Sequence, residues 1–333
     1  MKLALVGDIG GTNARFALWR DNRLESVQVL ATADYPGVEQ AILAYLAGLG
    51  LAPGAIHAVC LACAGPVSGD LFVFTNNHWR LSRSAFCRDL QVDELLLIND
   101  FSAMALGMTR LQDHERVEVC PGTAEAHRPA VVVGPGTGLG VGTLLGAADG
   151  SWQALPGEGG HVDLPIGTPR EAALWQQLYQ LNGHIRAEDV LSGGGLLLLY
   201  RALCALDGHA ETLASPAEIT TAALAGDEVA VAVIDQFSSW LGRVAGNNVL
   251  TLGGRGGVYI VGGIVPRFTE LFLRSGFARC FAEKGPMSKY MVDVPVWLVT
   301  AEYPGLTGAG VALQQVIEQR QIAEQRVGVR IPG

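Results

Sequence analysis

Leu95-Leu-Leu-Ile-Asn-Asp100-Phe101 is the stretch that decides the fold of this chain. Four consecutive apolar residues predict a short strand buried on both faces, or a piece of buried helix. The run leads directly into Asn99 and Asp100, an amide and a carboxylate that a core would not hold unpaired. Ligands of open α/β sheets bind at the carboxyl ends of strands, so this pair would face a crevice from a rigid support. The alternative is that Asp100 merely caps a helix beginning near Ser102.

The composition points to a large globular protein that acts on small solutes. Of the 333 residues, 49% are hydrophobic and 17% are charged, which predicts a large core and, from the length, two domains. A net charge of −9 without a basic run argues against nucleic acid or an anionic membrane as partner. The apolar start Leu3–Gly7 is too short for a signal peptide, and no run approaches the roughly 18 residues of a membrane span. These features predict a cytoplasmic protein.

The six cysteines show no paired framework. Cys60 and Cys63 have the spacing of a redox or zinc half-site, but they lie in the apolar run Ala58–Ala64 with no second pair or nearby histidine. We interpret them as small core residues.

A glycine-rich turn follows the first predicted strand, Leu3–Gly7, and leads into a second strand at Arg15–Trp19. Neither GxxxxGK[ST] nor GxGxxG occurs in the chain. A turn between strands, here Asp8–Asn13, can still bring backbone N–H groups close to phosphate, and Asp8 could hold a hydrated magnesium ion. A plain hairpin turn is the alternative.

Ala130–Gly140 repeats this arrangement, because a strand again runs into glycines and is followed by an apolar stretch at Val141–Leu145. Two loops of the same construction predict two related halves that face each other across a cleft.

Glycines also surround Glu158 and His161, which favours presentation of both side chains to a ligand over helix formation. The two could ligate a metal, but without a further clustered ligand hydrogen bonding is favoured. Glu188, taken alone, is interpreted as a solvated helix residue. Asn76–Trp79 could rim a carbohydrate site, but a surface loop is favoured.

The second half of the chain predicts a helical region over residues 215–250, opened by a capping box at Ser215–Glu218. Gly257–Arg267 predicts a strand, a glycine pair and a helix start, suited to a flat base or ribose lying on bare backbone. A glycine-spaced turn is expected over Pro304–Gly310, then a helix to about Glu324, and residues 325–333 predict a frayed tail.

Five motifs in order resemble the bacterial ATP-dependent glucokinases: Gly7-Asp-Ile-Gly-Gly-Thr-Asn13, Ile98-Asn-Asp100, Gly134-Pro-Gly-Thr-Gly-Leu-Gly140, Pro156-Gly-Glu-Gly-Gly-His161 and Val261-Gly-Gly-Ile-Val-Pro-Arg267. The similarity extends from about residue 3 to 316. It implies the α/β, two-domain actin-like ATPase (ribonuclease H-like) fold with an interdomain cleft. The small α/β domain would comprise residues 1–110 plus about 301–318, and the large α/β domain residues 111–300.

The resemblance also implies an activity, the transfer of the γ-phosphoryl group of ATP to the 6-hydroxyl of glucose with Mg²⁺, in a cytoplasmic homodimer. Asp100 would be the catalytic base. The implied sugar-binding residues are Asn99, Asp100, Glu158, His161 and Glu188. The implied nucleotide-binding residues are Gly7, Asp8, Ile9, Gly10, Gly11, Thr12, Asn13, Gly136, Thr137, Gly138, Gly262 and Gly263, with Asp8 holding magnesium through water. Pro135 departs from the pattern, since many relatives carry a small residue there.

Three other functions stay open. A kinase for another hexose or an amino sugar, from the related repressor and sugar-kinase group, commonly carries a cysteine-rich zinc motif after its histidine, but no cysteine follows His161 until Cys204. A sugar sensor without catalysis would need an output module, and a glycine turn beginning at residue 7 leaves no room for an N-terminal DNA-binding domain. An actin- or chaperone-like ATPase would leave Glu158 and Glu188 without a purpose. ADP or polyphosphate also stays open as phosphoryl donor.

Overall fold

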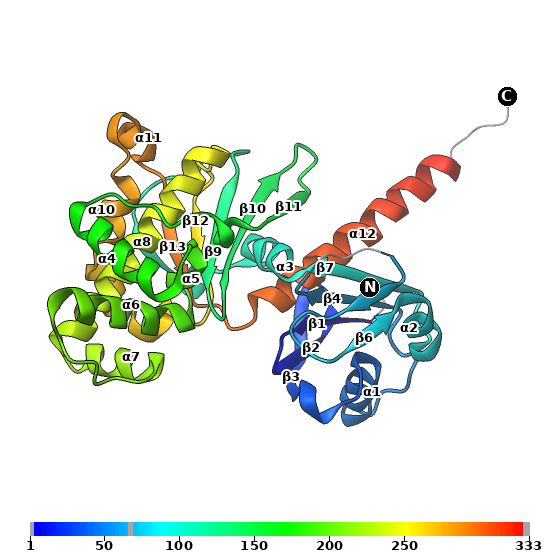
Figure 1. Cartoon of the computed structure of the whole chain (residues 1–333). Helices are drawn as coiled ribbons and strands as arrows, with labels where there is room; N and C mark the ends of the chain where they lie inside the picture. The colour runs from blue at the N-terminus through cyan, green and yellow to red at the C-terminus, as the bar shows by residue number, and fades with distance from the viewer. Residues whose placement is uncertain (1–2, 66–68, 329–333) are drawn as a thin grey trace. The chain divides into compact units, whose positions relative to one another are not determined.

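Residues 3–65 and 69–328 are described by a computed structural model (Figure 1). They divide into two compact units. Unit 1 holds the chain up to Leu111, Ser151–Ala154 and the segment from Glu302 onward, and unit 2 holds Gln112–Gly150 and Leu155–Ala301.

Unit 1 is built on a five-stranded sheet in the order β3-β2-β1-β4-β7. The strands β1, β2 and β3 pair antiparallel, whereas β1, β4 and β7 run parallel. A separate hairpin pairs β5 with β6. The strand bounds are β1 Ala4–Ile9, β2 Asn13–Arg20, β3 Arg23–Ala31, β4 Ala58–Cys63, β5 Leu71–Val73, β6 Arg80–Ser82 and β7 Glu94–Asn99.

Helices cover both faces of this sheet, as parallel strands require. Side chains of α1 and α2 share one core with Leu5, Val59 and Leu97, while α12 packs on β1 and β4 together with α3 (Figure 1). The helices of unit 1 are α1 Val38–Gly48, α2 Arg83–Leu90, α3 Asp100–Gly107 and α12 Pro304–Gly328, with short 3₁₀ turns η1 Thr32–Asp34 and η2 Met108–Arg110.

Unit 2 repeats the first sheet, in the order β11-β10-β9-β12-β13, and adds β8 beside β13. The strand β9 again pairs antiparallel with the strand that follows it and parallel with β12. The prediction of two halves of related construction is therefore confirmed. The strand bounds are β8 Arg116–Cys120, β9 Ala130–Pro135, β10 Leu139–Gly146, β11 Trp152–Gly157, β12 Val258–Ile260 and β13 Val296–Val299.

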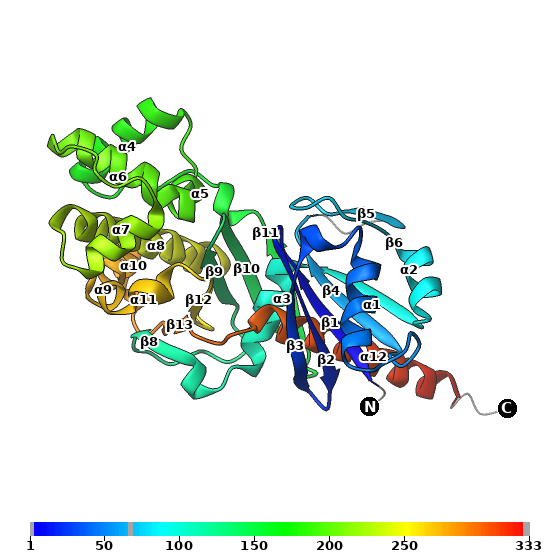
Figure 2. The same ribbon diagram turned by 90° about the horizontal axis from the view of Figure 1, so that it is seen from below.

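The long helix α8 is the centre of the helical layer in unit 2, since it contacts β9 of the sheet and also α6, α7 and α10 (Figure 2). The helices are α4 Pro169–Asn182, α5 Ala187–Val190, α6 Gly193–Asp207, α7 Pro216–Leu224, α8 Glu228–Leu252, α9 Thr269–Arg274, α10 Phe277–Ala282 and α11 Ser288–Met291. The 3₁₀ turns are η3 Asp113–Glu115, η4 Gly159–His161, η5 Val265–Phe268 and η6 Gly285–Met287.

The helical region expected over residues 215–250 is confirmed and consists of two helices, α7 and α8. Ser215 caps α7 as predicted. The helix ends at Leu224, and Gly226 follows with a φ of 90°, which an α-helix does not accommodate. Asp227 then caps α8 by accepting a hydrogen bond from the backbone N–H of Ala230 at 2.8 Å.

The glycine-spaced turn expected over Pro304–Gly310 was wrong, because these residues form the first turns of α12. Their glycines serve close packing. A methyl group at Gly308 would overlap the carbonyl oxygen of Ala103 in α3, and one at Gly310 would overlap the ring of Trp19. The helix continues to Gly328, so the predicted tail is wrong for residues 325–328, and residues 329–333 lie outside the described part of the chain.

None of the described helices is both long and apolar enough to cross a membrane.

The contact between α12 and α3 predicts the effect of Gly308→Ala. The added methyl group would meet the backbone of α3, including the Gly107 nitrogen at 2.7 Å, and backbone cannot move aside as a flexible side chain can. We expect the free energy of unfolding of unit 1 to fall by about 1–3 kcal/mol, measured by urea denaturation. Gly48→Ala in α1, where no described atom lies within 4 Å, is the control and should not reduce stability. If Gly308→Ala had the same free energy of unfolding as the parent protein, the close contact between α12 and α3 would be contradicted.

Candidate active site

The exit of β7 places Asn99 and Asp100 at the start of α3. The side-chain oxygen of Asn99 accepts a hydrogen bond from the Ser102 N–H at 3.0 Å and so caps the helix. Asp100 is the first helical residue, and its Oδ1 accepts from the Phe101 N–H at 2.8 Å. The alternative in which Asp100 caps a helix from Ser102 was therefore wrong, since the cap belongs to Asn99 and Asp100 is one residue further on.

Asp8 lies close to Asp100 because β1, β4 and β7 are parallel and in register. Asp8 is level with Ala62 of β4, which is level with Ile98 of β7, and Asp100 follows two residues later. Burial raises the pKa of Asp8 above its ordinary value of 3.8, the guanidinium of Arg15 lowers it, and the negative charge of Asp100 raises it further. Two carboxylates thus share one edge of the sheet.

Two groups beside Asp8 were not among the predicted site residues. Arg15 pairs with Asp8 across the β1–β2 hairpin, with its NH1 3.4 Å from Oδ2. A methyl group at Gly305, in the first turn of α12, would lie 3.4 Å from the same oxygen. A helix N-terminus favours negative charge nearby. Hairpin register could have indicated Arg15, but Gly305 comes from the opposite end of the chain, so no local signal pointed to it.

The first glycine turn is held by side chains from distant segments. Thr32 Oγ1 donates to the Gly11 carbonyl oxygen at 2.7 Å, and Asn77 Nδ2 donates to the Gly10 carbonyl oxygen at 3.0 Å. Asn76 is close too, because a methyl group at Gly11 would come within 2.8 Å of its backbone oxygen. With the carbonyl groups held in this way, the turn keeps one shape before any ligand arrives.

The surface-loop interpretation of Asn76–Trp79 was wrong for its last residue. Trp79 is fully buried, and its indole N–H donates to the carbonyl oxygen of Tyr35 at 3.0 Å.

Gly7 and Ile9, both predicted to bind nucleotide, lie inside β1. Ile9 belongs to the core, and a methyl group at Gly7 would come within 2.6 Å of a Leu61 methyl carbon. Only their backbone could therefore contact a ligand. Gly10, Gly11 and Thr12 form the turn itself, and Asn13 begins β2.

In unit 2, Glu188 is attached to the second glycine turn. Its Oε2 accepts a hydrogen bond from the Leu139 N–H at 2.9 Å, and a methyl group at Gly138 would overlap that oxygen. The turn itself closes through the Gly136 N–H, which donates to the Gly138 carbonyl oxygen at 2.8 Å, with Thr137 between them. Glu188 is only one quarter exposed, so its interpretation as a solvated helix residue was wrong.

His161 lies beside the same carboxylate. Its Nδ1 is 3.8 Å from Glu188 Oε1, and Arg186 NH1 is also 3.8 Å from that oxygen. The glycines that precede His161 allow this approach, because a methyl group at Gly160 would overlap the Leu139 carbonyl oxygen. Glu158 stands at the start of the same segment with its side chain exposed. The structure thus brings His161 and Glu188 together at the second turn.

The glycine pair after β12 lies next to the same turn. Gly262 has a φ of 92°, and a methyl group there would overlap the carbonyl oxygen of Pro135 at the end of β9. Around Gly263 no described atom lies within 4 Å of the methyl position, which leaves open space over bare backbone. Pro135 itself remains part of β9.

A magnesium ion fits the residues at the edge of the first sheet. Among residues 3–65 and 69–328 no group of three or more histidine, cysteine or acidic side chains could hold a metal by itself. Mg²⁺ does not need one, because it usually keeps several waters and takes one or two carboxylates together with substrate phosphates. Asp8 would supply such a carboxylate.

The cysteines Cys60 and Cys63 are free and buried in β4. Burial raises the pKa of the Cys60 thiol well above its ordinary value, which disfavours the thiolate that a metal or redox site requires. Their prediction as core residues is confirmed.

Comparisons with known proteins identify the family of this chain. The sequence model of the glucokinase family matches residues 5–316. The chain belongs to the glucokinase family. A glucokinase from Pseudomonas paraeruginosa is 58% identical over 98% of this chain and 96% of its own length. The crystal structure of a glucokinase from an Antarctic psychrotroph is 36% identical, with a TM-score of 0.86 over 95% of this chain and 99% of that one.

The fold extends beyond close relatives. A hexokinase of the repressor and sugar-kinase group (ROK) from Thermus thermophilus is only 20% identical, yet its structure covers 95% of this chain and 99% of its own at a TM-score of 0.68. These neighbours confirm the predicted α/β fold of the actin-like ATPases.

The raised pKa of Asp8 predicts that Asp8→Asn stabilises the protein without ligands. Above pH 3.8 the folded chain retains a proton on Asp8 that the unfolded chain has lost, so stability falls as pH rises through the folded pKa. The Asp8→Asn variant has no carboxyl group to ionise at this position, so it does not lose this stability. We therefore expect its Tm to exceed the parent's by a few degrees at pH 7 and to approach it near pH 4. Calorimetry over this pH range measures the difference, and a lower Tm at pH 7 would mean that the Arg15 ion pair outweighs the cost of burial.

Proposed function

We propose that this chain is an ATP-dependent glucokinase, which transfers the γ-phosphoryl group of ATP to the 6-hydroxyl of glucose and yields glucose 6-phosphate and ADP. The observation that supports this most directly is the position of Asp100, a carboxylate at the carboxyl end of β7, the edge strand of the first sheet, in a chain of the glucokinase family. Its relatives from Pseudomonas and the Antarctic psychrotroph bear the same name.

Asp100 acts as the general base in this proposal. It accepts the proton of the 6-hydroxyl as the bond from O6 to the γ-phosphorus forms and the bond to the ADP oxygen breaks. Phosphoryl transfer depends mostly on positioning and charge stabilisation, so a single carboxylate at the attacking oxygen is sufficient. Its place as the first residue of α3, fixed by the Asn99 cap, holds the carboxylate in one position.

Sugar recognition is assigned to Asn99, Glu158, His161 and Glu188, in addition to Asp100. The Asn99 cap uses only Oδ1, so its Nδ2 remains a donor for a sugar hydroxyl. The carboxylates of Glu158 and Glu188 accept hydroxyl hydrogens, and His161 can donate or accept. A site of such groups rejects a sugar that lacks one hydroxyl, because a buried polar partner would be left without a hydrogen bond.

The two glycine turns are assigned to the ATP phosphates, and Gly262 and Gly263 to the adenosine. Asp8 would hold Mg²⁺ through water, and the ion would neutralise charge on the phosphates during transfer. Binding of a cation beside Asp8 also offsets the cost of keeping that carboxylate ionised next to Asp100.

Glu188 couples the sugar set to the phosphate turn. One of its oxygens holds the Leu139 N–H, and the other lies beside His161. A sugar hydroxyl bound to this carboxylate would therefore fix the turn that receives the nucleotide.

The proposal includes a homodimer in the cytoplasm, as the family resemblance implies. Sedimentation of the purified chain at several concentrations tests the assembly.

A coupled assay for ADP release across a panel of hexoses tests the reaction. Turnover of glucose that greatly exceeds that of mannose, fructose and N-acetylglucosamine, and that depends on magnesium, supports the assignment. Preference for another hexose would favour the related sugar kinases, and glucose binding without turnover would favour a sensor. Replacing ATP by ADP or polyphosphate in the same assay tests the donor.

Asp100→Asn is expected to lower kcat by about 10²–10⁴-fold, because the amide keeps the shape of the side chain but cannot accept the proton. Glucose binding, measured by calorimetry, should be largely retained. Asp93→Asn, at an exposed position just before β7, is the charge-matched control and should keep parental kinetics. Retained activity of the Asp100 variant would remove this residue from the role of base.

Gly138→Ala tests the attachment of Glu188 to the phosphate turn. The added methyl group overlaps Glu188 Oε2 and must displace the carboxylate, the turn, or both. We expect kcat/KM for glucose to fall by about 10²-fold, since displacement of a positioning group by about 1 Å has that effect. In the double variant Glu188→Gln/Gly138→Ala, kcat/KM should be little lower than in the less active of the two single variants. If the two losses of kcat/KM were instead fully additive, the two positions would act separately.

A further inference from the structure

A pocket of about 230 Å³ lies in unit 2, away from every residue assigned to the kinase reaction. It is bounded by the start of α4, by one face of α8 and by Arg279 of α10. Neighbouring positions on α8, including Asp235, Gln236 and Ser239, line the same side. At about 30 Å³ for each water molecule, the pocket has room for roughly seven waters, or for a small organic ligand of the same total volume.

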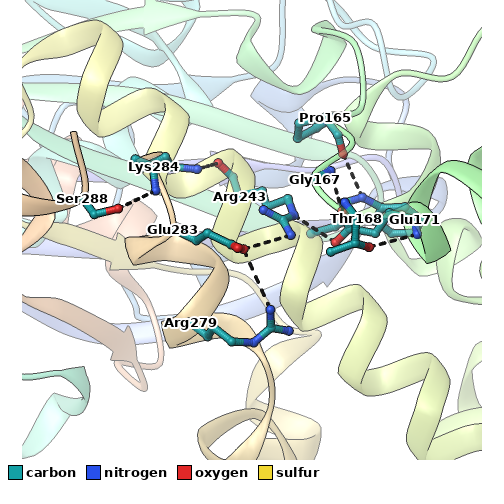
Figure 3. Close-up of polar contacts among 10 residues, drawn as sticks. Pro165, Gly167, Thr168, Glu171, Arg243, Arg279, Glu283, Lys284 and Ser288 are labelled. Atoms are coloured by element: carbon teal, nitrogen blue, oxygen red, sulfur yellow. Dashed lines mark hydrogen bonds and ion pairs between the residues drawn. The ribbon is translucent and has the colours of Figure 1, made fainter. Parts of the chain in front are cut away.

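The carboxylate of Glu171 in the pocket wall is fully used by the protein (Figure 3). Its Oε1 accepts a hydrogen bond from Arg243 Nε at 2.9 Å in a pair that is nearly inaccessible to solvent. Its Oε2 accepts from the backbone N–H groups of Gly167 at 2.6 Å and Thr168 at 3.0 Å. Glu171 therefore offers a ligand neither net charge nor a free acceptor.

Two further charged groups of the wall are also engaged. Arg170 makes a bidentate pair with Asp207, at 3.0 and 2.6 Å. Asp235 accepts a hydrogen bond from the Gly276 N–H at 2.8 Å and is exposed, so its charge is screened by solvent.

Three further side chains of the wall can donate hydrogen bonds into the pocket. Gln236 Nε2 is buried and has no hydrogen-bond partner among the described residues. The hydroxyl of Ser239, a residue only 4% exposed, takes part in none of the hydrogen bonds found in the described chain. Arg279 is largely exposed and forms a long ion pair with Glu283, whose Oε2 lies 3.9 Å from its NH1 (Figure 3).

We propose that this pocket is a second binding site, for a small organic anion with a carboxylate or phosphate group. The uncommitted amide and hydroxyl donate to its oxygens, and the Arg279 guanidinium supplies the opposite charge. A buried amide without a partner costs stability, and a ligand acceptor would remove that cost. The volume restricts the ligand to about the size of a three- or four-carbon acid or phosphate ester.

Calorimetric titration of the full chain, without ATP or glucose, tests the site. Malonate and glycerol 3-phosphate are the two anionic probes, which distinguish carboxylate from phosphate, and glycerol is the neutral probe. We expect at least one anion to bind and glycerol not to bind. Failure of both anions, or equal binding of glycerol and glycerol 3-phosphate, would overturn the proposal.

Two variants locate the binding. Gln236→Met removes the unpartnered donor at nearly constant volume, so the Tm should be unchanged or higher while anion affinity falls by about tenfold or more. Arg279→Gln should weaken anion binding similarly by removing an exposed charge. Arg88→Gln on α2 of unit 1, at a similarly exposed position, is the matched control and should bind as the parent does. Unchanged affinity in both pocket variants, or an equal loss in the control, would show that the anion binds elsewhere.

Discussion

The edge of the first sheet depends on keeping two carboxylates together in a partly buried place. Asp8 lies near the end of β1 and Asp100 directly follows β7, with β4 between the two strands, so their separation is set by strand register and by the Asn99 cap. Burial raises the pKa of Asp8, and the negative charge of Asp100 adds a smaller upward contribution. Arg15 and the first turn of α12 offset part of that cost. A polyphosphate with its cation would offset the rest, which is the physical basis for assigning phosphoryl transfer to this edge.

The second sheet repeats the strand order of the first but carries different chemistry at its glycine turn. The first turn is held by Thr32 and Asn77, whose side chains occupy carbonyl oxygens. The second is held by Glu188, whose side chain occupies an N–H and keeps another oxygen beside His161. One architecture therefore supports two glycine turns, and only the second is attached to a group assigned to the sugar.

The buried Arg243–Glu171 pair stabilises the segment that follows His161. Glu171 caps the start of α4 through the Gly167 and Thr168 N–H groups, and Arg243 lies against the same glycine, where a methyl group would overlap the guanidinium. Removing Arg243 alone would leave the Glu171 carboxylate buried without an opposite charge, which costs about 3–5 kcal/mol. The pair thus fixes one wall of the proposed anion pocket and the path of the chain from the His161 segment to α4.

The sequence by itself determined the apolar strands before each glycine turn, the two turns and the polar residues at their ends, because hydrophobic runs and glycine spacing are local signals, but it did not indicate β8 or β11. It also determined the family, since five motifs occur in order. Tertiary structure decided what no local pattern contains. The glycines of Pro304–Gly310, which were predicted to form a turn, lie in helix α12. They are needed there because close contact with α3 and Trp19 leaves no room for side chains. Glu188 is hydrogen-bonded to the second turn and is not a solvated helix residue. Arg15 and Gly305 both lie beside Asp8. These outcomes depend on packing between segments far apart in the chain, and the free energy of such contacts outweighs local preference.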